Sequence, residues 1–202
     1  MLIISKCDYK KAVTVLKDGG LVAFPTETVF GLGCLASKEE CFNELCKVKN
    51  RPADKPFTLM CSSIKQAEPY VEIDEIALKI INNFFPGQLT LILKAKNGLK
   101  DYLDLKTGYI GIRIPDDEFV LNMIGEVGEP LLVTSANISG QPVALNDEDA
   151  LFYFKDKIDV IVKGHGYSNV PSTVVMLKDG KLNVLRQGII TKEQLEEVIN
   201  EK

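Results

Sequence analysis

Three cations fall within one short segment of the chain. Lys49, Arg51 and Lys55 are interrupted by Pro52 and followed by Pro56. Proline restricts its own backbone and that of the preceding residue, so a loop of this kind loses little conformational entropy when it binds a ligand. Guanidinium and ammonium groups together suit the oxygens of a polyphosphate. We therefore expect a phosphate-binding loop, although a run of charges is more commonly a solvated surface.

A second candidate segment combines hydroxyl groups with glycines. Thr26 and Thr28 follow the apolar residues 21–24 and precede Gly31 and Gly33. Threonines after a strand often bond only to the local backbone, but hydroxyls and backbone N–H groups in a glycine-rich turn also bind anions. We expect a buried strand that runs into such a turn. Neither a full G-x-G-x-x-G nor a G-x-x-x-x-G-K-[ST] pattern occurs, which leaves a Rossmann cofactor site and a P-loop unsupported.

Small polar residues also follow a third apolar segment. Ser135, Asn137 and Ser139 come directly after residues 131–134. Open α/β sheets bind ligands beyond the carboxyl ends of their strands, so these side chains are candidates for the same site. A simple turn would account for them equally well.

Two arginines and one histidine need separate consideration. Arg113 interrupts an apolar strand, and it could either contact a ligand or face solvent from an edge strand. Arg186 lies on the flank of a predicted hairpin, as does Ser172. His165 is the only histidine, and no cysteine–histidine or serine–histidine–aspartate arrangement can be argued from it.

Composition sets the class of protein. The chain has 202 residues, of which 46% are hydrophobic and 26% charged, and its formal net charge is −4. This predicts one domain, spanning residues 1–202, that is not basic overall. The five cysteines show no C-x-x-C spacing, so we expect buried, reduced thiols rather than zinc ligands or disulfides. Without a signal peptide or a long apolar segment, the expected location is the cytoplasm and no membrane contact is expected.

The elements that must position these residues alternate between helix and strand. Asp179-Gly180 between two apolar runs predicts a hairpin, so the expected fold is a single α/β domain with a mixed sheet. Helices are predicted over 8–17, 37–48, 74–85, 116–124 and 146–154 and after residue 191; strands are predicted over 21–24, 57–61, 89–94, 109–114, 131–134, 158–162, 173–177 and 182–185.

Local signals define several of these boundaries. Ser37 with Glu40, and Thr191 with Gln194, predict capping boxes at the starts of two helices. The clearest helix carries an apolar stripe of Ala77, Leu78, Ile81 and Phe85. The loop 97–108 is expected to be a mobile segment.

Seven motifs together resemble one family. They are Phe-Pro-Thr-Glu-Thr-Val-Phe-Gly-Leu-Gly, Lys-Asn-Arg-Pro-Ala-Asp-Lys-Pro, Pro-Gly-Gln-Leu-Thr, Ile-Arg-Ile-Pro, Thr-Ser-Ala-Asn-Ile-Ser-Gly, Ser-Thr-Val-Val and Leu-Arg-Gln-Gly. In this order they closely resemble the YrdC-like threonylcarbamoyl-adenylate synthase family, in its short single-domain branch. Each motif alone is weak, but the series extends over residues 16–190 and is highly specific.

The resemblance implies a fold, a reaction and partners. The fold would be a twisted open α/β sandwich with a large positive cavity. The enzyme would be a nucleotidyltransferase that converts L-threonine, bicarbonate and ATP, the last carried with Mg²⁺, to threonylcarbamoyl-adenylate and pyrophosphate. Other proteins would then use the product to modify adenosine 37 of tRNA.

The resemblance also implies roles for individual residues. Lys49 and Arg51 with Ser135 and Asn137 match the family's tetrad, and the first two would act in catalysis. Thr26 and Thr28 match a threonine-binding turn, and Arg113 matches an arginine that holds the threonine carboxylate. Nucleotide or phosphate contacts are implied for Lys55, Thr90, Ser172 and Arg186. Two positions depart from the pattern: Phe30 replaces a tyrosine, and Met60 lies near a position where some members have a histidine.

Two other readings of the same residues stay open. The basic cavity could belong to a module that binds double-stranded RNA or tRNA without catalysis, whose affinity would fall steeply with salt. The chain could also be a carbamoyl-transfer domain related to those of hydrogenase maturation proteins, although such domains normally lie in longer chains.

Overall fold

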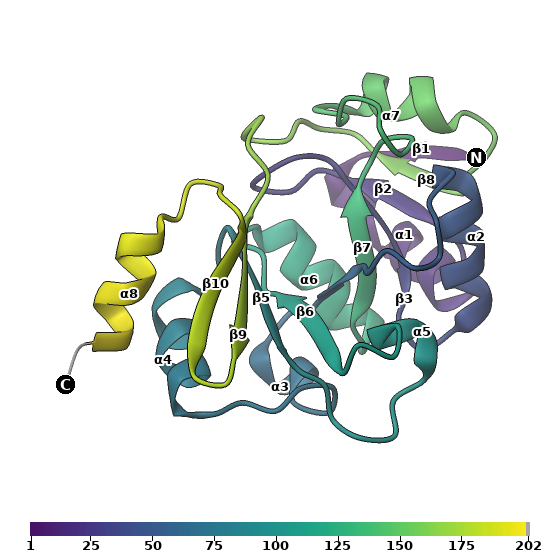
Figure 1. Cartoon of the computed structure of the whole chain (residues 1–202). Helices are drawn as coiled ribbons and strands as arrows, with labels where there is room; N and C mark the ends of the chain where they lie inside the picture. Colours follow the sequence, from purple (N-terminus) through teal and green to yellow (C-terminus); the bar gives the residue numbers. More distant parts are fainter. Residues whose placement is uncertain (201–202) are drawn as a thin grey trace.

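The computed structural model describes residues 1–200, and Figure 1 shows how their helices and strands are arranged. Ten strands in this part of the chain form one sheet in the order β1-β8-β2-β3-β7-β4-β6-β5-β9-β10. The strands are β1 (Leu2–Ile4), β2 (Val22–Phe24), β3 (Gly31–Leu35), β4 (Thr58–Met60), β5 (Leu89–Lys94), β6 (Tyr109–Arg113), β7 (Leu131–Ser135), β8 (Val160–Val162), β9 (Thr173–Lys178) and β10 (Lys181–Arg186).

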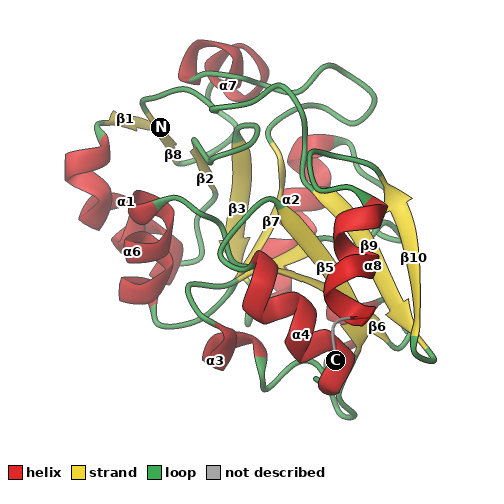
Figure 2. Ribbon diagram, turned by 90° about the vertical axis from the view of Figure 1, so that its left-hand side faces the viewer, coloured by secondary structure: helices red, strands yellow, loops and turns green. Residues whose placement is uncertain are grey.

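Helices connect most of these strands. They are α1 (Tyr9–Lys17), α2 (Glu39–Lys49), α3 (Ile64–Ala67), α4 (Glu75–Phe84), α5 (Asp101–Asp104), α6 (Glu118–Val127), α7 (Asp147–Phe154) and α8 (Lys192–Asn200), with a short 3-10 helix η1 (Lys6–Asp8) before α1. Figure 2 shows α1 beside α6 and α8 beside α4, and both helix pairs are in contact. No helix among residues 1–200 is both long and apolar enough to cross a membrane.

The sheet is mixed. Strand β8 pairs in parallel with both β1 and β2, and the pairs β4–β6 and β5–β9 are also parallel, whereas the other neighbours are antiparallel. Strands at the two ends of the order run in clearly different directions (Figure 1), as strand twist requires. The prediction of an α/β fold with a twisted, open, mixed sheet is confirmed.

The two faces of the sheet carry different side chains because residues alternate along each strand. The side chains that enter the larger core cluster are Leu89, Leu91 and Leu93 of β5 and Ile110 and Ile112 of β6. Side chains of α2, α4, α7 and α8 pack into the same cluster. The opposite face meets α1 and α6 over β2, β8 and the ends of β4 and β7, where a smaller core cluster forms. Beyond these two helices the second face is left uncovered for the site.

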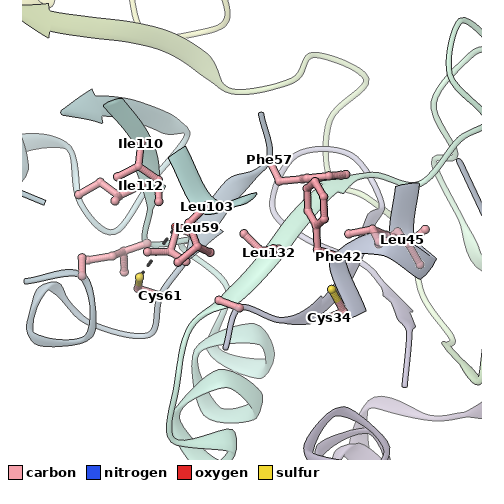
Figure 3. Packing of buried hydrophobic residues seen from close by; sticks show 14 of the residues in the cluster. Cys34, Phe42, Leu45, Phe57, Leu59, Cys61, Leu103, Ile110, Ile112 and Leu132 are labelled. Carbon is pink, nitrogen blue, oxygen red and sulfur yellow. Dashed lines mark hydrogen bonds between the residues drawn. The ribbon is translucent and has the colours of Figure 1, made fainter. Parts of the chain in front are cut away.

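The larger core holds most of the cysteines as apolar side chains. Cys34 and Cys61 lie among leucines, isoleucines and aromatic rings (Figure 3), and neither is exposed. Burial raises the pKa of both thiols, that of Cys61 to about 12. All five cysteines are free, but Cys7 is exposed, so the expectation of buried thiols is correct only for the other four. Burial raises the pKa of those four thiols, which makes them poor nucleophiles.

Boundaries that rest on local chemistry are confirmed. Asp74 caps α4 through a 2.8 Å bond from the Ala77 N–H. Thr191 and Gln194 form the reciprocal bonds of a capping box at α8. The hairpin between β9 and β10 turns at Asp179-Gly180, where both residues have positive φ as a two-residue turn of this type requires.

Other local predictions are wrong. The capping box at Ser37 does not form, because α2 begins two residues later with Lys38 at the N-cap and no side-chain bond there. Leu78, assigned to the inward stripe of α4, is 49% exposed, and Ile80 is buried in its place. Strand β1 was not predicted, and α5 lies within the predicted loop 97–108, with Tyr102 of α5 buried.

The glycine-rich turn after Thr28 is in fact a strand. Gly31 and Gly33 belong to β3, which pairs with β2 and β7, and neither glycine has a positive φ. A Cβ atom on Gly33 would come within 3.0 Å of a methyl group of Val133 and 3.3 Å of the Phe24 ring. These glycines therefore allow side chains from neighbouring strands to lie close across the sheet.

Candidate functional site: a cationic cavity on the sheet

A cavity of about 270 Å³ lies on the uncovered part of the second sheet face. Its wall includes the guanidinium side chains of Arg51, Arg113 and Arg186, and hydroxyl groups of threonines and serines. Among residues 1–200 no aspartate or glutamate contributes to this wall. The cavity is therefore strongly cationic in a chain whose net charge is −4, and a field of that sign attracts anions.

The cavity is built from alternate positions of central strands. Thr58 and Met60 of β4, Thr90 and Ile92 of β5, and Arg113 of β6 face it, while the residues between them enter the core. The expectation of a site beyond the carboxyl ends of strands fits Ser135 of β7 and the Thr26–Thr28 turn after β2, whereas Asn137 and Ser139 lie outside the wall. The strand residues of the wall lie on a face of the sheet.

Arg113 is held in place by a buried carboxylate. Its Nη2 lies 2.8 Å from Oε1 of Glu27 and donates a 2.9 Å hydrogen bond to Oγ1 of Thr28. Only 6% of Arg113 and 8% of Glu27 are exposed. Since β6 lies between β4 and β5, the solvent-facing edge position considered for Arg113 is excluded.

Thr26 and Thr28 form a compact hydroxyl pair. Their Oγ1 atoms are 3.0 Å apart, and Thr26 Oγ1 donates to the Val29 carbonyl and accepts from the Thr28 N–H. The Thr26 hydroxyl is thus used by the local turn, as the purely structural reading predicts. Both threonines nevertheless line the cavity. Arg113 holds the hydroxyl of Thr28, so the turn and the arginine form one unit.

The other end of the cavity contains a hydroxyl pair and an arginine. Thr90 Oγ1 and Ser172 Oγ are 2.9 Å apart, and both residues are buried. Arg186 donates from Nε to the Ser172 carbonyl at 3.0 Å and from Nη2 to the Ser172 hydroxyl at 3.2 Å. Partial burial, and then the charge of Arg113, lowers the pKa of Arg186. Two guanidinium groups therefore repel each other across the cavity unless an anion lies between them.

Lys49 is directed away from the cavity and into the loop after β7. It is the last residue of α2, and Asn50 ends the helix in the left-handed conformation that asparagine tolerates. Its Nζ donates to the Ser135 carbonyl at 2.5 Å and to the carbonyl and Oδ1 of Asn137 at 2.7 and 3.1 Å. Burial, and then the charge of Arg51, lowers the pKa of Lys49 to about 7.

The Lys49 contacts bring the matched tetrad together. Ser135 Oγ also donates to Asn137 Oδ1 at 2.7 Å, and Ser139 N–H donates to the Lys49 carbonyl. Of these four residues, Arg51 and Ser135 line the cavity, whereas Lys49 and Asn137 do not. In this arrangement Lys49 fixes the loop that presents Ser135.

The basic loop folds back on its own arginine. Arg51 donates from Nη2 to the Pro56 carbonyl at 2.8 Å and from Nε to the Lys55 carbonyl at 3.4 Å, and its guanidinium lies 4.9 Å from the Phe57 ring centroid. Phe57 packs edge-on against Phe42 of α2 in the core (Figure 3). Lys55 is exposed and outside the cavity wall. The structure therefore brings one of the three predicted cations, Arg51, to the cavity.

The two positions that depart from the family motifs both contribute apolar surface. Phe30 and Met60 are buried and line the cavity, and Met60 pairs in register with Arg113 on the neighbouring strand. An apolar patch therefore lies beside the guanidinium of Arg113. A ligand with both an anionic group and a small aliphatic group would match this wall.

Sequence reasoning missed several residues of the wall, such as Thr58 and Thr134, and the charged partner of Arg113. Glu27 was considered only as part of the threonine turn, yet it is the carboxylate partner of Arg113 and also accepts the Asp116 N–H at 3.0 Å. The available signal was a lone acidic residue within an otherwise uncharged segment. Among residues 1–200 no three histidine, cysteine, aspartate or glutamate side chains are grouped so that they could hold a metal ion.

The fold and the cavity define an α/β protein with a cationic candidate site on its sheet. The family model Sua5/YciO/YrdC, described as telomere recombination, matches residues 14–188. The chain belongs to this family. It is 36% identical over 192 residues to a threonylcarbamoyl-AMP synthase of Bacillus subtilis, covering 94% of this chain and 56% of that protein.

Two solved structures share the fold. The structure of Pyrococcus abyssi Sua5 complexed with L-threonine has a TM-score of 0.92 and 33% identity, covering 100% of this chain and 62% of that one. Escherichia coli YciO has a TM-score of 0.86 and 27% identity, covering 96% and 98%. In sequence, YciO, named as an uncharacterized protein, is 29% identical over 181 residues, 89% of this chain and 88% of YciO. The chain thus spans nearly all of YciO but less than two thirds of the synthase and Sua5 relatives.

Proposed function

We propose that the protein is a threonylcarbamoyl-AMP synthase, a nucleotidyltransferase that joins L-threonine, bicarbonate and ATP. The observation that carries the proposal is the cavity itself, in which three arginines and several hydroxyls face a space without a carboxylate in its described wall. Relatives with this name, and a Sua5 structure with L-threonine, support the choice among anionic ligands. The product would serve other proteins that form N6-threonylcarbamoyladenosine at position 37 of tRNA in the cytoplasm.

Threonine binds at the Arg113 end of the cavity. The guanidinium of Arg113 receives the carboxylate, and the hydroxyls of Thr26 and Thr28 lie beside it. Met60 supplies an aliphatic wall against which the threonine methyl group packs. Since Glu27 already orients Arg113, little ordering is needed when the substrate arrives.

The nucleotide binds toward Arg186, Ser172 and Thr90, and the triphosphate extends to Arg51. Arg51 and Arg186 make no ion pair with a carboxylate among the described residues, so their charge is available to phosphate oxygens. Mg²⁺ enters as part of the MgATP substrate, held by phosphates and water, since the cavity wall offers no carboxylate to bind it.

The reaction needs alignment and charge neutralisation more than a strong base. The threonine amine captures carbon dioxide derived from bicarbonate and becomes a carbamate. A carbamate oxygen then attacks the α-phosphorus, a new P–O bond forms, and the bond to the β-phosphate breaks with release of pyrophosphate. Arg51 neutralises charge on the leaving group, and Lys49 acts indirectly by fixing Ser135.

The test is pyrophosphate release from ATP, measured with and without threonine and with and without bicarbonate. Release that requires both substrates supports the proposal. Arg51→Ala should lower this release by at least about 100-fold, as loss of one charge-stabilising donor does elsewhere. Lys47→Ala is the matched control, because Lys47 lies on α2, four residues before Arg51, is exposed, and among residues 1–200 forms an ion pair with Glu44 alone.

Two results would overturn the proposal. If release does not depend on threonine, the cavity does not run this reaction. If, in addition, RNA binds with an affinity that falls steeply with salt, the chain is a nucleic-acid-binding module. Full activity of Arg51→Ala would remove Arg51 from the mechanism while leaving the reaction in place.

A further inference from the structure

A second cavity, of about 410 Å³, lies on the other side of the Thr26–Thr28 turn. Four carboxylate side chains contribute to its wall: Glu27 and the three consecutive residues Asp116, Asp117 and Glu118 at the start of α6. Two aromatic rings, Phe119 and Tyr167, and the ammonium group of Lys6 complete it. Its charge is opposite in sign to that of the main cavity.

A cation already occupies the space between the two rings. The Nζ of Lys6 lies 5.3 Å from the Phe119 centroid and 5.4 Å from the Tyr167 centroid, within the range of cation–π attraction. Its distance to Asp117 Oδ2 is 3.4 Å, longer than the usual 2.7–2.9 Å of a charge-assisted hydrogen bond. The Lys6 side chain is 32% exposed. The Lys6 ammonium is therefore held by one long ion pair and two ring contacts, and part of its side chain already faces solvent.

The second observation is an unsatisfied carboxylate oxygen. Glu27 is only 8% exposed, and its Oε1 receives both Arg113 and the Asp116 N–H. Its Oε2 is buried and has no hydrogen-bond partner among the described residues. A buried acceptor without a donor costs free energy. Because this oxygen is itself buried, it favours a cation in the cavity through its negative charge rather than through a direct hydrogen bond.

The chemistry of the wall selects the kind of cation. A metal ion prefers several oxygen ligands at short distances, and no such group exists among residues 1–200. Aromatic faces beside carboxylates instead suit an ammonium or guanidinium group, which combines a positive charge with N–H donors. The wall contains four carboxylates and one ammonium group, that of Lys6. The carboxylates remain in excess when Arg113, the partner of Glu27, is counted as a second cation.

We propose that this second cavity binds an organic cation, a primary ammonium or guanidinium group, which takes the place of Lys6 between the rings of Phe119 and Tyr167. The cation has two possible sources, a free polyamine or a lysine or arginine side chain of another protein. Both present the same group to the cavity.

The experiment is a ¹H–¹⁵N NMR titration of the full chain with two probes. Spermidine represents the free amine, and the peptides acetyl-Gly-Lys-Gly-amide and acetyl-Gly-Arg-Gly-amide represent side chains; n-propanol is the uncharged control. The signals to follow are the backbone amides of residues 116–119 and of Tyr167. Saturable shifts centred on these residues are expected with the cations and none with propanol.

Two variants test the mode of binding. Lys6→Met removes the resident competitor and should tighten binding by about threefold or more, whereas Lys10→Met, an exposed lysine on α1, should not change it. Asp117→Asn should weaken binding by about threefold or more. Asparagine caps a helix as well as aspartate does, so α6 keeps its N-cap bond to Val120 N–H.

Each outcome decides the matter. Tighter binding of spermidine than of the peptides assigns the site to a free amine, and the reverse order assigns it to a partner's side chain. Shifts spread over the whole surface, or unchanged binding in Asp117→Asn, would show general attraction to an acidic protein and overturn the proposal. Weaker or unchanged binding in Lys6→Met would also overturn it. None of these readouts depends on the activity proposed for the main cavity.

Discussion

Arg113 and Arg186 face the same cavity but differ in how their charge is compensated. Arg113 is 6% exposed and paired with the buried carboxylate of Glu27, whereas Arg186 is exposed and contacts only the carbonyl and hydroxyl of Ser172. Burial of a charge requires a partner, while a charge at the surface does not. The comparison indicates that Arg113 belongs to both the fold and the site, and that Arg186 belongs to the site alone.

The largest expected effect comes from breaking the buried pair. Arg113→Met leaves the Glu27 carboxylate buried without its cation, so the free energy of unfolding should fall by about 3–5 kcal/mol. Urea denaturation at pH 7 measures this. The double variant Glu27→Gln/Arg113→Met should recover much of the loss, since it also removes the orphaned charge. A loss below about 1 kcal/mol in Arg113→Met would mean that the pair does not couple fold and site.

Removal of Arg186, which has no carboxylate partner among residues 1–200, should affect nucleotide binding more than stability. Arg186→Ala should change the free energy of unfolding by less than about 1 kcal/mol, because no carboxylate loses its partner. The KM for ATP should nevertheless rise by about tenfold, since one charge-assisted contact to phosphate is lost. Steady-state pyrophosphate release at saturating threonine checks this. An unchanged KM for ATP would exclude Arg186 from the nucleotide end.

Lys49 extends the comparison to a cation buried without a carboxylate. Burial lowers the pKa of Lys49 to about 7, whereas the pKa of lysine in the unfolded chain is about 10.4. Between pH 7 and about 10.4 the unfolded state binds more protons at Lys49 than the folded state does, so the free energy of unfolding rises with pH. Below pH 7 Lys49 is charged in both states, and its burial then destabilises the fold to the full extent. Relative to Lys49→Met, the wild type should gain about 1 kcal/mol or more between pH 7 and 9.

Paired denaturation curves at the two pH values give this difference directly. Lys47→Met is the control, because Lys47 is exposed and its difference from wild type should stay constant. If the difference in unfolding free energy between wild type and Lys49→Met is the same at pH 7 and 9, the three oxygens around Nζ hold the ammonium charged throughout that range.

The smallest effect on nucleotide binding is expected from the hydroxyl pair of Thr90 and Ser172 that supports Arg186. Thr90→Val keeps the shape of the side chain but removes the bond to Ser172, which in turn accepts from Arg186. The unfolding free energy should fall by about 0.5–1.5 kcal/mol, and the KM for ATP should rise about two- to threefold. Thr14→Val on the exposed face of α1 is the control. A rise in the KM for ATP larger than that of Arg186→Ala would reverse the assigned order of importance in nucleotide binding.

Local chemistry could be predicted from the sequence, and spatial relationships could not. Helix ends at Asp74 and Thr191 depend on neighbours three residues away, so their caps were identifiable. The strand containing Arg113 was also identifiable, but whether it lies at an edge depends on strand order, which involves the whole chain. A glycine that adopts a positive φ in a turn cannot be distinguished in a sequence from a glycine that leaves room for a neighbouring side chain. Gly31 and Gly33 are of the second kind, which explains why a turn was wrongly predicted there.

The site was predictable to the extent that motifs identify which residues meet. Lys49 does contact Ser135 and Asn137, as the matched tetrad implies, yet the direction of its ammonium group away from the cavity could not be inferred. Glu27 was missed because its partner lies on a strand far along the chain, and a lone acidic residue gives no indication of what it contacts. Roles in binding and catalysis stay predictions for the experiments above.

The alternation that builds the main cavity restricts how such a site can evolve. In β4, β5 and β6 every residue that faces the cavity has a core residue on each side. A one-residue insertion would turn Arg113 into the core and bring Ile112 into the cavity, so the strand would lose its function and its packing in one event. Binding sites on loops can diversify by changes in length. The part of this wall that β4, β5 and β6 form can change only by substitution at alternate positions, whereas the parts formed by loops, such as those of Arg51 and Ser172, can also change in length.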